Sequence, residues 1–478
     1  MAESSSLRKN KISLENYDYK QDIENRLLMA QFSSKDLEIL EEILYSSIKI
    51  PIRRLAKSID LNEVEVLAIL KKLNKTGLFA FEGDSIIIDK ETRKYFEAQI
   101  SKFDPDFKPG MDFLQSLLRK VPIHMLPIWY SIPRTSNNIF DSLVEKYLLT
   151  PQIFQRYLME LNFNDQILAD IVAEVYQAPD FKIYAKDIVE KYGISKEQFE
   201  EYLLQLEFHF VCTLGYEKIN DEWTEIITPF HEWREYAFFL KNTEVTSITS
   251  LTDIVRFRSH DFSYIQDLSI LLNMAKKQPL ALSADKDKKI LPNKAILNSL
   301  ATKMEGFEEN DPAFMIYVDR LISKTRQLKL ADIVDNRLYA LESANDFLDM
   351  HLEGRAIFFY RHPLNRLLSK EICAELITDR NLREAEKSIV RVLHSGWVYF
   401  EDFIRGIIVP LGEESVVMLK RQGKTWKYTL PAYSEEELAL IKATVLDWLF
   451  EIGVTAIGTH HGKDCFCVTS FGQSLFGR

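Results

Sequence analysis

A cluster of lysines between Lys276 and Lys303 is the first feature of this sequence that could carry out binding chemistry. The segment holds seven lysines and two aspartates, a net charge of +5 in a chain whose overall net charge is −11. Lysines in turns and at helix starts suit phosphate contacts, because ammonium groups and free N–H groups both favour anions. The segment therefore predicts a nucleic-acid-binding surface, with a solubilising loop as the alternative. The predicted contacts are Lys286, Lys288, Lys289, Lys294 and Lys303.

A second group of reactive side chains, His460-His461 and Cys465-x-Cys467, lies near the end of the chain. Alternate residues of a strand share a face, so both thiols could point the same way and contribute to a zinc site. However, the two histidines are adjacent, and structural zinc sites usually pair cysteines as Cys-x-x-Cys. We therefore interpret Cys465 and Cys467 as core residues of a strand, and we expect no metal.

The sequence has no recognisable catalytic motif. It lacks G-x-S-x-G, H-E-x-x-H, a dinucleotide fingerprint and a phosphate-binding P-loop. The acidic run Glu305, Glu308 and Glu309 is typical of a solvated loop rather than a carboxylate site. We expect a protein without catalytic activity or cofactor, and keep an enzyme of unrecognised type as an alternative that a pocket with converging carboxylates or histidines would support.

Composition limits the classes of protein further. At 478 residues the chain is too long for one core, so three or four domains are expected. Sixteen glycines are few for a glycine-loop nucleotide fold, and four cysteines do not form a disulfide framework. No apolar run approaches the roughly 18 residues that span a bilayer. We expect a soluble, cytoplasmic protein, and the acidic charge favours a protein partner over strong unaided DNA binding.

The elements that must position these residues follow a recurring pattern. In the first module, Ser33-Ser-Lys-Asp36 predicts the start of a helix, Pro51 opens a second helix, and residues 63–74 form a third that ends at Gly77. A hairpin over residues 78–89 follows, which completes the element order of a winged helix. The last residues repeat this outline: a helix ending at Gly453, two strands, and a Thr469-x-x-Gly472 turn that seals the core.

The sequence thus predicts a mainly helical α+β fold made of tandem winged-helix-like modules. Helical periodicity, turn residues and composition changes predict the segment boundaries. The predicted segments are a flexible lead-in (1–30, with a helix near 22–29), a winged-helix module (33–103), a Pro-containing connector (104–136), a helical or winged-helix module (137–240), a linker (241–262), a helical module (263–355), a helical bridge (356–382) and a terminal winged-helix module (383–478, with a polar excursion over 412–425).

The C-terminal half resembles the helicase-associated domain that accompanies XPB-type helicases in prokaryotes. The resemblance rests on Leu271–Leu280 and Leu291–Leu297, and on a later set of single positions, and it covers roughly residues 265–478. Those positions are Trp397, Leu446, Leu449, Gly453, Thr469 and Gly472. The resemblance implies an accessory region that contacts DNA or a neighbouring ATPase motor. The chain departs from the family in having no motor, which implies that the motor is a separate polypeptide or is absent.

Two functions remain open at this point. The leading hypothesis is a non-enzymatic accessory protein of DNA transactions, which binds a separately encoded helicase, remodelling ATPase or transcription protein, and DNA weakly. The alternative is a winged-helix scaffold that binds proteins and no nucleic acid. A basic surface across several modules would favour the first, and an acidic or apolar surface the second.

Overall fold

Small antiparallel sheets and many helices build this chain. The computed structural model describes residues 11–104, 106–133, 138–163, 165–220, 222–284, 290–304, 307, 311–362, 372–423 and 425–477. Helices make up 56% of the chain and strands 15%, and every strand pair is antiparallel. The predicted α+β, mainly α class is therefore confirmed.

The chain divides into two compact units whose sequences interleave. Unit 1 consists of Met1–Phe238 and Met418–Thr429, and unit 2 consists of Phe239–Val417 and Leu430–Arg478. The first boundary lies inside helix α13 (His231–Asn242) rather than in the predicted linker 241–262. That serine- and threonine-rich segment instead contributes a strand to unit 2, because its backbone pairs with a strand far along the chain.

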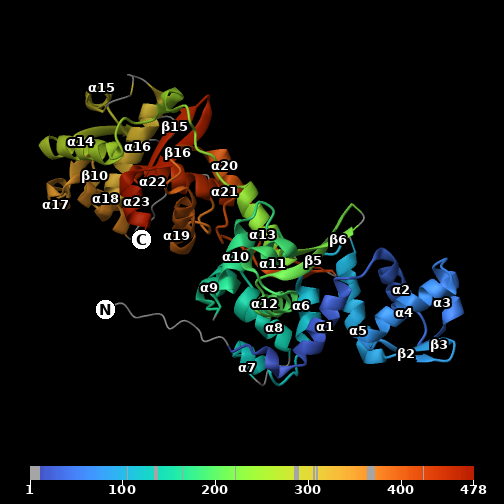
Figure 1. Ribbon diagram of the computed structural model, residues 1–478. Helices are drawn as coiled ribbons and strands as arrows, with labels where there is room; N and C mark the ends of the chain where they lie inside the picture. Colours follow the sequence, from blue (N-terminus) through green and yellow to red (C-terminus); the bar gives the residue numbers. More distant parts are fainter. Residues whose placement is uncertain are drawn as a thin grey trace. The chain divides into compact units, whose positions relative to one another are not determined.

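One arrangement of elements occurs four times, twice in each unit (Figure 1). A helix is followed by a short strand, two further helices and a hairpin, and the short strand pairs with the second strand of the hairpin. We call these the first (34–88), second (166–228), third (263–340) and fourth (379–468) repeats, and we call the helix before the hairpin the third helix of each repeat.

In unit 1, two repeats are joined by helices. The first repeat consists of α2 (Ser34–Tyr45), β1 (Lys49–Pro51), α3 (Ile52–Ser58), α4 (Glu63–Leu73), β2 (Phe79–Glu82) and β3 (Ser85–Ile88). The second consists of α10 (Gln166–Gln177), β4 (Ile183–Tyr184), α11 (Ala185–Tyr192), α12 (Lys196–Phe208), β5 (Thr213–Ile219) and β6 (Glu222–Thr228). The other helices are α1 (Tyr19–Met29), α5 (Lys90–Ile100), the 3-10 turn η3 (Ser101–Phe103), α6 (Met111–Leu118), α7 (Leu126–Tyr130), α8 (Ile139–Leu143) and α9 (Pro151–Glu160).

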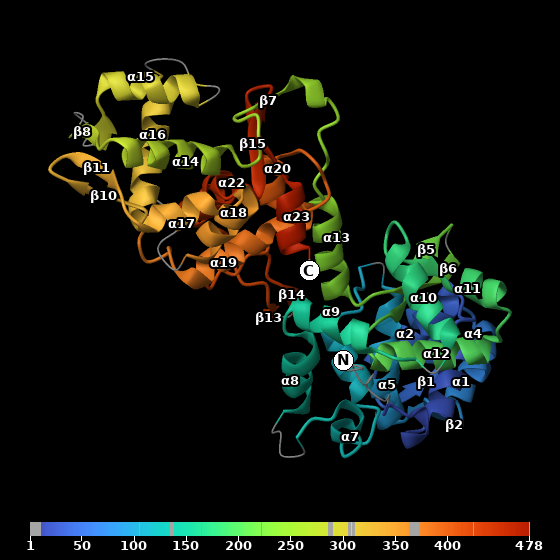
Figure 2. The ribbon, with the colours of Figure 1, turned by 90° about the vertical axis from the view of Figure 1, so that its left-hand side faces the viewer.

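Unit 2 holds the third and fourth repeats (Figure 2). The third consists of α14 (Ser263–Lys277), β8 (Leu280–Ala284), β9 (Ile290–Pro292), α15 (Lys294–Lys303), α16 (Pro312–Gln327), β10 (Ala331–Val334) and β11 (Arg337–Ala340). The fourth consists of α19 (Asp379–Lys387), η6 (Ser388–Val392), β12 (Val398–Tyr399), α20 (Phe400–Arg405), α21 (Glu435–Lys442), η7 (Ala443–Trp448), α22 (Leu449–Glu451), β15 (Thr455–His460) and β16 (Lys463–Val468). The remaining elements are η5 (Leu251–Asp253), β7 (Ile254–Arg256), α17 (Ser343–Asp349), α18 (Leu352–Arg361) and α23 (Ser470–Phe476).

Each pair of repeats shares one hydrophobic core. Buried apolar residues from Met29 to Ile227 form a single cluster in unit 1, and those from Tyr264 to Val468 form a single cluster in unit 2. The predicted segments 33–103 and 137–240 are therefore not separate cores. The expectation of a flexible lead-in is also wrong for residues 11–30, because α1 is packed into unit 1 with Ile23 and Arg26 buried.

A hairpin inserted in the fourth repeat belongs to unit 1. The sequence predicts a polar excursion over 412–425, but β13 (Leu419–Gln422) and β14 (Thr425–Tyr428) form a two-stranded sheet. The Leu419 N–H donates to the carbonyl of Leu149 at 2.8 Å, and the Tyr428 hydroxyl donates to the carbonyl of Leu148 at 2.7 Å. Tyr428 is buried in aromatic contacts with Trp233 and Tyr236. This packing holds the hairpin on unit 1 although most of its strand residues are polar.

Candidate functional site

The predicted lysine surface is described only in part. Lys294 begins α15 and Lys303 ends it, and both side chains are exposed, whereas Lys286, Lys288 and Lys289 lie outside the described residues. The N-cap Asn293 accepts the Ile296 N–H at 3.0 Å, which satisfies one of the free donors that could bind a phosphate.

Lys276 and Lys277, at the end of α14, are also exposed. Neither these two lysines nor Lys294 and Lys303 form an ion pair with any described residue. The described part of the segment thus offers four hydrated ammonium groups, which are available to an anionic partner.

The third helix of a repeat would lie in the major groove if these repeats read DNA as winged helices do. In the second repeat that helix, α12, cannot do so. From Phe199 to Phe208 its side chains are buried except Glu201 and Gln205, which are partly buried, and α1 packs along it. Only the first turn, Lys196 to Gln198, is exposed.

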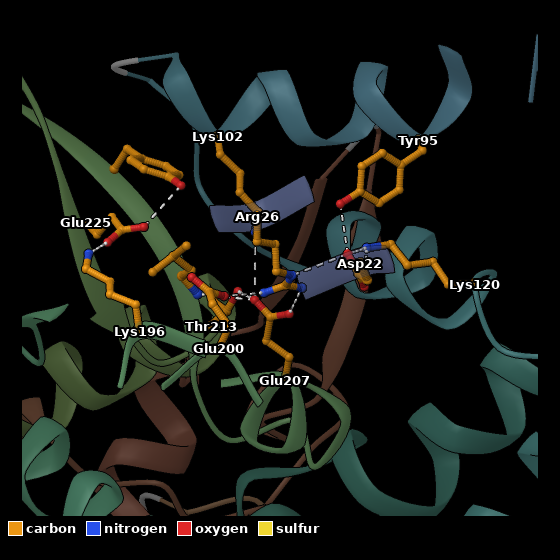
Figure 3. A network of polar contacts seen from close by, with 12 residues as sticks. Asp22, Arg26, Tyr95, Lys102, Lys120, Lys196, Glu200, Glu207, Thr213 and Glu225 are labelled. Carbon is orange, nitrogen blue, oxygen red and sulfur yellow. Dashed lines mark hydrogen bonds and ion pairs between the residues drawn. The ribbon is translucent and has the colours of Figure 1, made fainter. Parts of the chain in front are cut away.

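Buried charges fill the face of α12 that meets α1 (Figure 3). Arg26 donates to Glu207 at 2.6 Å and lies 3.4 Å from Asp22 and 3.6 Å from Glu200. Thr213 donates its hydroxyl to Glu207 at 3.0 Å, and the Leu214 N–H donates at 3.3 Å. Lys102 and Lys120 complete the buried charge network, which consists of Asp22, Arg26, Lys102, Lys120, Glu200 and Glu207.

Desolvation dominates the titration of this network. Burial alone would raise the pKa of Asp22, but Lys120 and Arg26 hold it well below its usual range. Burial raises the pKa of Glu200 to about 7 despite Arg26, and it lowers the pKa of Lys102 to about 8 despite Glu207. Both carboxylate oxygens of Glu200 and the Lys102 ammonium lack a hydrogen-bond partner among the described residues. Only Lys120 reaches the surface, with a side chain that is 16% exposed, so we interpret these charges as structural.

The third helices of unit 2 are buried in a similar way. On α16, Arg320 donates to Asp447 at 3.0 Å and to Glu451 at 2.8 Å, and Lys324 lies 3.0 Å from Glu451. Since Asp447 and Glu451 belong to the third helix of the fourth repeat, the two repeats pack through their third helices. Lys324 and Glu451 are both about 2% exposed.

The first repeat is different, because its third helix, α4, presents an open face. Val64 is 77% exposed, and Glu63, Glu65 and Lys71 are exposed beside it. On the neighbouring helix α3, the side chains of Arg53, Arg54 and Lys57 are exposed, and Arg53 donates to Glu63 at 3.0 Å. We call these residues the α3–α4 surface. It carries four basic and two acidic side chains together with the exposed apolar Val64, and its acidic first turn disfavours phosphate.

The cysteines of β16 are core or partly buried residues. Cys465 is buried and Cys467 is half-buried, and burial raises the pKa of each thiol to about 11. Within the described part of the chain, the group of His, Cys, Asp and Glu side chains close enough to hold a metal includes neither cysteine. The zinc site considered for these cysteines is therefore not assembled.

The sequence analysis does not predict the burial of α12 and α16. Glu200, Glu207 and Lys324 lie among apolar residues of their helices, which is a local signal that a charged face is buried.

None of the described helices is both long and apolar enough to cross a bilayer. Comparison of the sequence with models of protein families and with curated proteins finds no match.

Proposed function

We propose that this chain is a non-catalytic scaffold of four winged-helix-like repeats that binds a protein partner through the α3–α4 surface. The observation that supports the proposal is the contrast between third helices: α4 is open, whereas those of the other three repeats are used for internal packing. A mixed-charge surface with an exposed Val64 suits a protein better than a phosphate backbone. The resemblance of residues 265–478 to a helicase-associated domain makes a separately encoded helicase or remodelling ATPase the first partner to test.

A single exposed side chain allows a sharp test. Val64→Asp places a charge on the α3–α4 surface, and Met159→Asp is its control because Met159 is 83% exposed on α9. Tagged chains are purified from the native host with nuclease treatment, and co-purifying proteins are quantified by mass spectrometry. We expect one partner to be lost with Val64→Asp and kept with Met159→Asp. A partner set that is identical in both variants and the wild type would contradict the proposal.

Binding of nucleic acid is the second candidate, and the four exposed lysines of α14 and α15 favour it. Replacing Lys286, Lys288, Lys289 and Lys294 with alanine should flatten the slope of log affinity for duplex DNA against log salt by about 3.6, if each contacts a phosphate. The control is a fourfold alanine variant of exposed lysines on the first repeat and α5: Lys57, Lys71, Lys75 and Lys90. An unchanged slope in the first variant would leave the protein-binding scaffold as the function.

A further inference from the structure

The tip of the β15–β16 hairpin brings together three side chains that are distant in sequence. Asp253, His460 and His461 each offer a ligand atom, and these atoms all lie within 4.8 Å of one another. His460 is buried, whereas Asp253 and His461 are exposed. The group is thus anchored on one side and open to solvent on the other.

The turn of the hairpin explains how two adjacent histidines face the same point. Consecutive residues of an extended strand point to opposite faces, which argues against a shared ligand. Here His460 ends β15, and His461 and Gly462 form the turn with φ of 51° and 77°. These two left-handed residues reverse the chain, so the His461 ring lies beside the His460 ring. The two ring centroids are 4.1 Å apart.

The added strand β7 supplies the carboxylate. It pairs antiparallel with β15, and the register places Ile254 opposite His460. Asp253, the residue before Ile254, therefore lies at the tip of the hairpin, beside His461. Neither the Asp253 carboxylate nor the His461 ring forms an ion pair with any residue the structure describes, and the carboxylate accepts only the neighbouring Thr252 hydroxyl, at 3.4 Å.

Two hydroxyl groups fix the ring of His460. The Tyr399 hydroxyl lies 2.5 Å from Nδ1, and the Ser250 hydroxyl lies 2.9 Å from Nε2. A histidine that binds a metal through one nitrogen commonly donates the proton of the other to a neighbouring oxygen, which sets its tautomer and orientation. The Tyr399 hydroxyl can accept a proton from Nδ1. Nε2 is then the nitrogen that could bind a metal ion, with the Ser250 hydroxyl beside it.

We propose that Asp253, His460 and His461 bind a divalent transition metal of the zinc class. Two imidazoles and a carboxylate are a donor set that zinc accepts, with a fourth position left for water or the Ser250 hydroxyl. Bond lengths of about 2.0–2.2 Å place tetrahedral ligand atoms about 3.3–3.6 Å apart, so small rotations of the exposed Asp253 and His461 side chains close the site. Bound metal would join β7 to the hairpin. The inference is independent of the proposed function.

Metal titration of the full-length chain tests this site. Protein stripped with a chelator is titrated with zinc chloride by calorimetry, and the bound metal is counted by elemental analysis after gel filtration. We expect one zinc per chain. Asp253→Asn and His461→Ala should each weaken binding at least tenfold, and Tyr399→Phe should weaken it about 10- to 100-fold if it orients His460. Because Asp253 and His461 are exposed, their variants should keep the wild-type circular dichroism spectrum.

Two controls separate this site from other ligands of zinc. His351→Ala removes an exposed histidine of unit 2 that is outside the group, and Cys467→Ala removes a thiol of β16. Both should bind zinc as the wild type does, and the cobalt-substituted protein should lack a thiolate-to-cobalt charge-transfer band. The proposal is overturned if the wild type binds no zinc, if Asp253→Asn and His461→Ala bind it unchanged, or if Cys467→Ala abolishes binding.

Discussion

Arg26 is held in the core of unit 1 by the carboxyl groups of Asp22, Glu200 and Glu207, and its side chain is only 2% exposed. Burying a charge is costly, and a buried ion pair often contributes little net stability compared with apolar residues of the same size. Removing only one partner of a buried ion pair is nevertheless strongly destabilising, because the other charge stays buried without compensation. The buried charge network therefore specifies how α1 docks on α12 more than it stabilises the unit.

This cost predicts a large effect of a single substitution. Arg26→Met keeps the size of the side chain but leaves Asp22 and Glu207 without their shared cation. We expect the free energy of unfolding of unit 1 to fall by about 3–5 kcal/mol in urea unfolding followed by circular dichroism. Lys94→Ala removes an exposed pair with Glu91 and should change it by less than about 1 kcal/mol. Equal effects of the two substitutions would refute a specific role for Arg26.

Glu200 makes the stability of unit 1 depend on pH. Its pKa is about 7 in the folded chain because of burial, against an ordinary value of 4.5. Between these values the folded state binds the proton and the unfolded state does not, so the stability that Glu200 contributes is full below pH 4.5 and is lost as pH rises to 7. Burial raises the pKa of Glu232 to about 7 as well, so this side chain adds to the decline. Burial lowers the pKa of His209 to about 4, so His209 opposes the decline between about pH 4 and its ordinary value of 6.5.

The corresponding variant is Glu200→Gln, which cannot lose a proton. Its urea midpoint should fall less than that of the wild type between pH 4.5 and 7, because the substitution removes only the contribution of Glu200. Glu197→Gln, an exposed carboxylate on the first turn of the same helix, serves as the control and should follow the wild-type profile. Parallel profiles for wild type and Glu200→Gln would show that Glu200 is ionised in the folded chain.

At the scale of elements, local signals in the sequence predict where helices begin and end. Ser33 and Asp36 form a reciprocal capping box at α2, as do Ser434 and Glu437 at α21, and Gly77 ends its helix with a φ of 69°. Such contacts span three or four residues, so the sequence contains them directly. The module predicted as helical over residues 263–355 also contains strands, because pairing with β11 makes residues 331–334 a strand.

Partners that are distant in sequence could not be predicted in this way. The candidate lysine surface follows from composition alone, but the burial of α12 depends on α1, which lies about 180 residues earlier. Similarly, Asp253 reaches His461 only because β7 adds to the edge of β15. Nothing in the local pattern of residues 250–256 specifies that edge, since Leu251, Ile254 and Val255 would suit a strand at the edge of any sheet.

The terminal Thr-x-x-Gly turn does seal the core, as the sequence predicts. The Thr469 hydroxyl donates to the Gly453 carbonyl at 2.7 Å and accepts the Gly472 N–H at 3.1 Å, which starts α23. A Cβ at Gly472 would lie 2.4 Å from the carbonyl oxygen of Val454. Backbone atoms cannot yield as a flexible side chain can, so α23 must shift to accept any larger residue.

Gly472→Ala should therefore destabilise unit 2 by about 1–3 kcal/mol, the usual cost of overpacking a core. Ser474→Ala changes an exposed position of the same short helix and should be nearly neutral. Thermal unfolding of both variants and of the wild type gives the comparison. A Gly472→Ala variant as stable as the wild type would mean that α23 is not fixed against the strand that begins after Gly453.

At the scale of the whole molecule, the chain crosses between its two units three times, at 238/239, 417/418 and 429/430. Neither unit is one continuous stretch of sequence, because the hairpin of β13 and β14 completes unit 1 although it is encoded within the fourth repeat. Trp426 packs on Phe140, and Tyr428 packs on Trp233, so aromatic surface of unit 1 depends on residues that are synthesised much later.

A truncated chain should show this dependence. A fragment of residues 1–238 lacks the hairpin, and losing the burial of two large aromatic side chains costs about 3 kcal/mol or more. In a domain of this size that lowers the melting temperature by roughly 6–12 °C. A synthetic peptide of residues 416–431, added in excess, should restore part of the loss, because binding to the folded state stabilises it. A peptide with Trp426 and Tyr428 both replaced by alanine should not, and equal melting temperatures with either peptide would show that the hairpin is not part of the folding unit.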